Sequence, residues 1–131
     1  MRTVDVDTKQ GKFQQTVTTG PHTLVGDESV ELGGEDAGPA PHEFLLTALG
    51  TCTSMTVKMY ADRKGWKLEH VHVHLTMEKP EGGGTVVRRE VELRGDLDSE
   101  QRARLLDIAG KCPVHKTLTG KLDLLIVAAP T

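Results

Sequence analysis

The stretch from Pro41 to Lys64 carries the longest helical pattern in the chain and constrains the fold more than any other segment. Its apolar residues recur at steps of four, three, four and three, which predicts a helix with one apolar stripe. Proline fits the first turn because it has no amide hydrogen to leave unpaired, and Gly65 is a typical helix end. Because few charges occur before Lys58, we expect this helix to lie in a core or an interface. The stripe residues are Leu45, Leu49, Cys52, Thr56 and Met59.

Strand patterns precede and follow this helix. Two segments rich in threonine and valine flank Gln10–Gly11, which predicts a β-hairpin, and a third short strand comes after Gly20–Pro21. Beyond the helix, apolar and polar residues alternate in two segments joined by a glycine-rich turn, which predicts a second hairpin. The predicted strands are residues 3–9, 12–19, 22–25, 70–77 and 87–94.

The last third of the chain predicts two short helices and a final strand. Gln101 follows Asp98 by three residues, which is a partial capping box for a helix that ends near Gly110. Cys112–Pro113 predicts the start of a short helical turn that ends at Gly120, and residues 122–127 predict the strand. This order of elements, with no internal repeat or linker, predicts an α+β fold in a single domain over residues 1–131.

Large side chains are scarce in this chain. Aromatic residues make up 3% of the sequence, so the core must be built from valine, leucine, alanine and methionine. A chain of 131 residues is expected to bury roughly two thirds of its unfolded surface. Because such a core is thin, we expect further burial against a second copy in a homodimer. The aromatic residues are Phe13, Phe44, Tyr60 and Trp66.

The charge pattern argues against nucleic acid and membrane partners. The formal net charge is −3, and the densest basic stretch, with Arg88, Arg89 and Arg94, is interrupted by Glu90 and Glu92. We therefore expect these arginines to lie on a solvated strand face and not on a phosphate-binding stripe. The N-terminal residues have no apolar signal region, and no run approaches the roughly 18 apolar residues of a membrane helix. These features predict a cytoplasmic protein.

The two cysteines are the candidate chemistry. In a reducing compartment permanent disulfides are uncommon, so Cys52 and Cys112 are either small buried hydrophobic residues or reactive thiols. Cys112 precedes Pro113 at a predicted helix N-terminus, where unpaired amides favour an anionic sulfur, and His115 adds an imidazole nearby. The alternative for this Cys–Pro pair is a simple turn with a small buried side chain.

Four segments of the sequence resemble the OsmC/Ohr family, the osmotically induced protein C and organic hydroperoxide resistance proteins. The resemblance covers nearly the whole chain, including the separation of the two cysteines. It implies an OsmC-like fold, in which two chains form an intertwined homodimer with antiparallel sheets wrapped around long central helices. The segments are GPAPHEFLL (38–46), ALGTCTSMT (48–56), YADRKGW (60–66) and CPVH (112–115).

The same resemblance implies a thiol peroxidase. Cys52 matches the cysteine that attacks an organic hydroperoxide and becomes a sulfenic acid, and Cys112 matches the cysteine that resolves it to a disulfide. An external thiol or dithiol then acts as the reductant, and no cofactor is needed. Family peroxidases hold the reactive thiolate with an N-terminal arginine and a glutamate directly after the helix-starting proline. Here no arginine occurs between Arg2 and Arg63.

The position after Pro41 is His42, and the carboxylate of Glu43 comes one place later. We therefore treat His42 as a candidate replacement for the arginine, although a solvent-facing histidine is the simpler interpretation, and Glu43 and His115 as supporting residues. The missing arginine also favours a second hypothesis, a non-catalytic small-ligand-binding or redox-sensing protein.

The histidines at positions 70, 72 and 74 favour a weaker third hypothesis, a zinc protein. Alternate strand residues lie roughly 6.5–7 Å apart, too far for three imidazoles to converge on one ion, so we expect no metal site.

Overall fold

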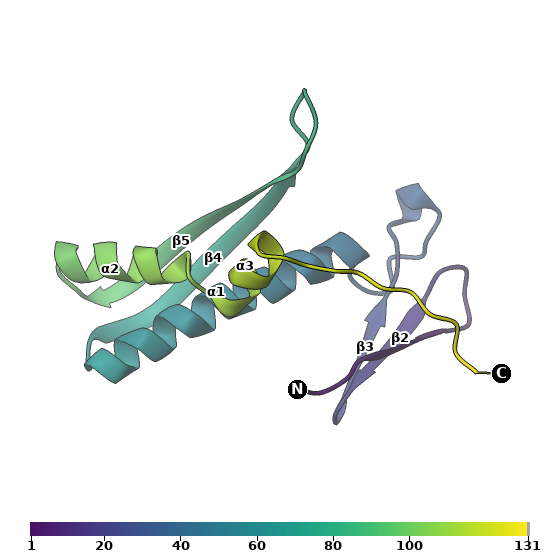
Figure 1. Ribbon diagram of the computed structural model, residues 1–131, viewed down its shortest axis with the longest axis horizontal. Helices are drawn as coiled ribbons and strands as arrows, with labels where there is room; N and C mark the ends of the chain where they lie inside the picture. Colours follow the sequence, from purple (N-terminus) through teal and green to yellow (C-terminus); the bar gives the residue numbers. More distant parts are fainter. Residues whose placement is uncertain (131) are drawn as a thin grey trace. The chain divides into compact units, whose positions relative to one another are not determined.

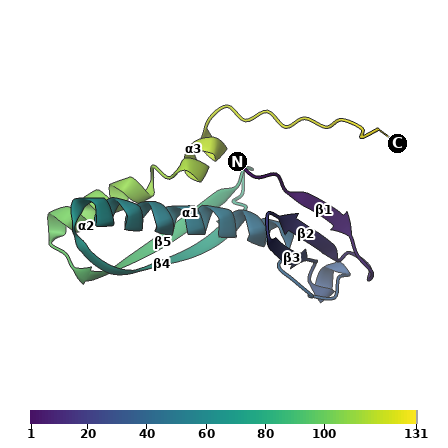
Figure 2. The same cartoon turned by 90° about the horizontal axis from the view of Figure 1, so that it is seen from below.

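The computed structural model describes residues 1–130 and contains two compact units, residues 1–47 and the remainder of the chain from residue 48, which are described separately. The first unit holds a three-stranded antiparallel sheet in the order β1–β2–β3 (Figure 2). Its first two strands form the predicted hairpin, and the third pairs with β2 from Thr19↔His22 to Gln15↔Gly26. The strands are β1 (Asp5–Thr8), β2 (Gln15–Thr19) and β3 (His22–Gly26).

The breaker-rich segment after β3 is an ordered loop that contains a short 3₁₀ helix, η1 (Val30–Leu32). The carboxylate of Asp27 is buried and accepts backbone N–H bonds from Glu28, Glu35 and Ala37 at 2.8–3.2 Å. The bond from Ala37 contributes most to lowering the pKa of Asp27 below its usual value. An ionised side chain therefore organises this loop.

The long helix α1 (Pro41–Lys64) has the predicted bounds and begins in the first unit. Glu43 accepts the Ala40 N–H at 2.8 Å, which satisfies one amide at the helix start. The predicted stripe is wrong in phase, because Leu45 and Met59 are exposed and only Leu49 of that set is buried. The buried face advances in steps of four through small or branched side chains, which allow close packing. These residues are Leu49, Thr53, Val57 and Ala61.

The second hairpin consists of β4 (Lys67–Glu78) and β5 (Val86–Asp96), paired antiparallel as predicted. The pairing register shifts between Leu68 and His70, opposite Gly95. Gly95 has φ +151°, and a Cβ atom there would lie 2.0 Å from the carbonyl oxygen of Lys67. This bulge therefore requires glycine.

Two short helices follow, α2 (Ser99–Ala109) and α3 (Pro113–Thr119). Asp98 and Gln101, predicted as a partial capping box, form both hydrogen bonds of a complete one at the start of α2. The core of this unit joins α1, β4 and α2, and α3 lies beside the middle of α1 in both views (Figures 1 and 2). The core residues are Val57, Ala61, Leu68, Leu105 and Ala109.

The predicted final strand is wrong for this chain as described. Residues 121–130 have no regular secondary structure and leave α3 as an extended segment (Figure 1). Leu124, Leu125, Ile126 and Val127 are 86–99% exposed, so the segment has strand-like composition but no strand to pair with here. Among residues 1–130, no helix combines the length and apolarity needed to cross a membrane.

Candidate active site

Cys112 is the N-cap residue of α3, and its sulfur serves as the cap. Cys112 Sγ accepts the His115 N–H at 3.4 Å, in the way that a serine or aspartate oxygen does at other helix starts. Pro113 follows at the first helical position. The Cys112 side chain is fully buried. Cys112 therefore lies at a helix N-terminus, as the sequence predicts, and its sulfur accepts one of the amides there.

Cys52 lies on α1 at the margin of its buried face and is partly exposed. Cys52 Sγ accepts the Val114 N–H at 3.5 Å and lies 4.0 Å from the hydroxyl of Thr56. The two sulfurs therefore take adjacent backbone amides from the first turn of α3. Both cysteines are free thiols.

Arg89 of β5 is the functional residue that sequence reasoning missed. Its Nη1 donates to Thr53 Oγ1 at 2.9 Å and lies 4.0 Å from Cys112 Sγ, and its Nη2 donates to His115 Nδ1 at 2.7 Å. The predicted solvated position is therefore wrong for Arg89. The signal was present, since strand alternation places Arg89 on the same face as Val87 and Val91.

The guanidinium of Arg89 has no carboxylate partner among residues 1–130. Thr53, which accepts a hydrogen bond from Arg89, is neutral. A guanidinium only donates hydrogen bonds, so His115 Nδ1 must be the acceptor nitrogen of a neutral ring. The nearest group able to balance its charge is the sulfur of Cys112. This arrangement favours a thiolate at that atom.

The pKa of the Cys112 thiol is below its ordinary value. Burial is the largest influence and raises the pKa, but hydrogen bonds from the His115 N–H, the Thr53 hydroxyl and the Cys52 thiol outweigh it, together with the charge of Arg89. The adjacent amides of Val114 and His115 donate to Cys52 and Cys112, which places the two thiols side by side. The surroundings of Cys112 therefore favour its thiolate, although Cys112 is the less exposed of the two cysteines.

The three supporting residues predicted from the sequence have different positions in the structure. The His115 ring and amide both belong to the site, through Arg89 and Cys112. His42 is exposed in the first turn of α1, and Glu43 serves as a helix cap. His42 and Glu43 belong to the first unit, whereas both cysteines belong to the second.

The three strand histidines share an exposed face of β4. Within residues 1–130, no three histidine, cysteine or acidic side chains lie close enough to hold a metal ion. The cross-strand partners are charged, as expected for a solvated face. The pairs are His70↔Arg94, His72↔Glu92 and His74↔Glu90.

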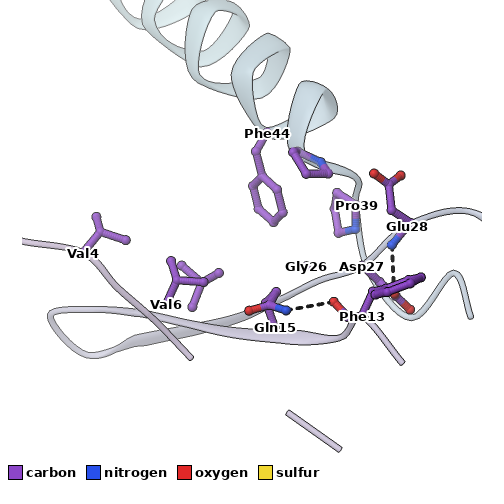
Figure 3. Close-up of a pocket in the computed structure, with 11 residues that line it drawn as sticks. Val4, Val6, Phe13, Gln15, Gly26, Asp27, Glu28, Pro39 and Phe44 are labelled. Atoms are coloured by element: carbon purple, nitrogen blue, oxygen red, sulfur yellow. Dashed lines mark hydrogen bonds between the residues drawn. The ribbon is translucent and has the colours of Figure 1, made fainter. Parts of the chain in front are cut away.

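Each unit has a hollow large enough to admit a small molecule. One, of about 300 Å³, opens onto Arg89 and His115 and is otherwise bordered by Leu49, Val87 and Leu118, among others. The other, of about 530 Å³, lies in the first unit, where Phe44 projects from the first turn of α1 toward the strands (Figure 3). The second hollow is lined mostly by apolar side chains, Val4, Val6, Phe13 and Phe44 among them.

The fold and the site define an α+β protein with a paired-thiol centre at a helix N-terminus. The family model for OsmC-like proteins matches residues 33–126, and the chain belongs to that family. Comparison with curated proteins finds no match.

Solved structures share the fold. An OsmC-like protein from Mycoplasma pneumoniae is 19% identical with a TM-score of 0.76, over 92% of this chain and 88% of that one. The organic hydroperoxide resistance protein OsmC from Legionella pneumophila is 20% identical with a TM-score of 0.69, over 94% and 92%. The organic hydroperoxide resistance protein OhrB of Bacillus subtilis is 17% identical with a TM-score of 0.63, over 94% and 93%.

Proposed function

We propose that this protein reduces organic hydroperoxides, with Cys52 as the attacking thiol and Cys112 as the resolving thiol. The observation that carries the proposal is the shared site of the two sulfurs at the first turn of α3, with Arg89 beside Cys112. Two structural relatives are organic hydroperoxide resistance proteins by name. The difference in exposure assigns the roles, because a peroxide reaches the partly exposed sulfur first.

The reaction proceeds in two steps at sulfur. The Cys52 thiolate attacks the terminal oxygen of the hydroperoxide, an S–O bond forms as the O–O bond breaks, and the alkoxide takes a proton from water to leave as an alcohol. The Cys112 thiolate then attacks the Cys52 sulfur, the S–S bond forms, and the departing hydroxide takes a proton to become water. An external dithiol restores both thiols by two exchange reactions and is itself oxidised to a disulfide.

Arg89 prepares the second step. Its charge, balanced by no carboxylate within residues 1–130, favours the thiolate form of Cys112 before any peroxide arrives. Thr53 and His115 fix the guanidinium in place through hydrogen bonds. Arg89 on β5 therefore supplies a positive charge at the thiol site of a chain that has no arginine between Arg2 and Arg63.

The test is consumption of cumene hydroperoxide with a dithiol reductant. We expect Cys52→Ser to abolish turnover and Cys112→Ser to stop after one turnover, with a sulfenic acid at Cys52 that dimedone traps. Arg89→Gln slows disulfide formation, whereas Arg88→Gln, on the opposite face of the same strand, leaves it unchanged. Full turnover by Cys52→Ser would disprove the proposal.

A second candidate function is binding of a small apolar ligand, with the thiols as an oxidation sensor. The observation that favours it is the apolar hollow of about 530 Å³ in the first unit. Absence of turnover in the wild-type protein, together with ligand binding lost in Phe44→Asp, would favour this function over peroxide reduction.

We also propose that the working form is an intertwined homodimer. The chain leaves an unusually apolar C-terminal segment exposed, and several large apolar side chains of α1, such as Met55 and Met59, are 58–60% exposed. Monomers rarely expose large contiguous apolar patches. A second copy gives both surfaces a partner.

A further inference from the structure

The apolar hollow of the first unit has acidic residues at one end. Val6, Val17 and Phe44 belong to its apolar part, and Phe44 projects into it from the start of α1 (Figure 3). Asp27 and Glu28 are the charged side chains in its lining, which includes no lysine, arginine or histidine of residues 1–130. A molecule in this hollow therefore meets hydrocarbon over most of its surface and negative charge at one end.

The negative charge at this end has no positive partner in the described part of the chain. The buried, ionised carboxylate of Asp27 accepts three hydrogen bonds, all from backbone amides, which leaves about one of its four lone-pair positions free. No lysine or arginine of residues 1–130 forms an ion pair with Asp27 or Glu28. A cation that enters the hollow would be the first to pair with them, and an opposite charge stabilises a buried carboxylate.

An aromatic ring lies beside the acidic end. Phe13 lines the hollow and lies next to Asp27 (Figure 3). The face of an aromatic ring attracts a cation, and the ring also packs well against hydrocarbon. The ring and the two carboxylates together favour a positively charged group over a neutral or a negative one.

We propose that this hollow binds a primary amine in its ammonium form, joined to an apolar chain. The ammonium group donates hydrogen bonds to the carboxylates of Asp27 and Glu28 beside Phe13, and the chain packs against the valines and Phe44. The volume of about 530 Å³ lies within the range of roughly 300–1,000 Å³ that is usual for small-molecule sites. The inference rests on the second candidate function, ligand binding in this hollow, and adds the chemical class of the ligand.

The first experiment compares three ligands that share one chain length and differ in the charge of the head group. n-Octylamine, 1-octanol and octanoate are each titrated into the wild-type protein by isothermal titration calorimetry at neutral pH, where the amine is protonated as lysine is. We expect octylamine to bind most tightly and octanoate most weakly. In amide NMR spectra, octylamine should shift the signals of Gly26 and Glu28, which line the hollow.

Two variants test the acidic end of the hollow. Glu28→Gln removes a charge, and Phe13→Leu removes a ring but keeps an apolar side chain. Each should lower the affinity for octylamine about fivefold, as one partly exposed charge or cation–π contact would, and leave the affinity for octanol nearly unchanged. Asp27 is kept in both variants, because its carboxylate organises the loop.

The matched control is Glu31→Gln. Glu31 is an exposed carboxylate of η1 in the same loop and does not line the hollow. We expect this variant to bind octylamine as the wild-type protein does. Equal losses of affinity in Glu28→Gln and Glu31→Gln would mean that the net charge of the loop attracts the amine, and the proposal would be overturned.

The remaining outcomes separate this proposal from the function on which it rests. Equal affinities for octylamine and octanol would overturn the ammonium class and leave binding of apolar ligands standing. Binding of none of the three would overturn both. Binding that appears only in Leu124→Glu/Ile126→Glu, a variant of the exposed C-terminal segment, would mean that this segment of a second copy occupies the hollow, and would also overturn the proposal. Peroxide turnover at the thiols is a separate measurement and does not alter these outcomes.

Discussion

Arg89 brings a positive charge to the inner face of β5, and its strongest expected effect is on the protonation of Cys112. In Arg89→Gln we expect the pKa of Cys112 to rise, because an opposite charge at close range favours the ionised form. Thiolate ultraviolet absorbance, titrated in a Cys52→Ser background, measures this directly. Arg88→Gln is the control, since Arg88 faces away and pairs with Glu78. An equal shift in both variants would contradict a local role for Arg89.

The lowered pKa of Cys112 also makes stability depend on pH. A thiol that ionises more readily when folded stabilises the protein most above its unfolded pKa, near 8.5, and this contribution is lost as pH falls through the folded pKa. We expect the difference in unfolding free energy between wild type and Cys112→Ser to grow as pH rises through this window. Serine keeps the helix cap without titrating there. Urea unfolding under reductant at several pH values would show a constant difference if Cys112 did not ionise.

At the scale of elements, interactions between residues close together in the chain allowed the sequence to predict where helices begin and end. Pro41, Gly65 and the Asp98–Gln101 capping box predicted helix ends correctly because caps involve residues only a few positions apart. The buried face of α1 was misjudged because the polar Thr53 lies at its centre, hydrogen-bonded to Arg89. That contact joins residues 36 positions apart, and no local pattern encodes it.

The bulge at Gly95 sets the geometry at the end of the β4–β5 hairpin. Gly95→Ala should lower the free energy of unfolding by about 1–3 kcal/mol, because the backbone there is left to glycine and the new methyl group meets the Lys67 carbonyl. Gly110→Ala is the matched control, since Gly110 has φ −74° and an added Cβ there would make only an ordinary contact, 3.6 Å from the Asp107 carbonyl oxygen. Urea denaturation of both variants is the measurement. Equal stability of the two would mean that the bulge relaxes without cost.

At the scale of the whole molecule, the apolar C-terminal segment predicts the assembly state. We expect light scattering to give twice the 14.2 kDa chain mass for the wild-type protein. Leu124→Glu/Ile126→Glu should shift the protein to monomer, because each leaves a charge where an interface would exclude water. Lys121→Glu/Asp123→Lys, two polar changes in the same segment, should leave the mass unchanged. A wild-type monomer at all concentrations would contradict the proposed dimer.

The composition of this C-terminal segment predicts a strand, but the described chain does not form one there. Residues 122–127 have the β-branched and leucine-rich character of a strand, and they are extended without a partner in the described chain. A strand exists only where hydrogen-bonding neighbours are supplied, so propensity alone does not decide it. The same reasoning applies to the site. Its two cysteines could be identified from sequence motifs, but the arginine beside them could be identified only once the packing of its strand was known.

The use of a sulfur as a helix cap ties oxidation to backbone protection. As a thiolate, Cys112 Sγ is a strong acceptor for the His115 N–H, whereas a sulfur in a disulfide carries no charge and accepts weakly. The first turn of α3 should therefore loosen when the disulfide forms and tighten again on reduction. The exchange rate of the His115 amide proton would then report whether Cys112 is a thiolate or part of a disulfide.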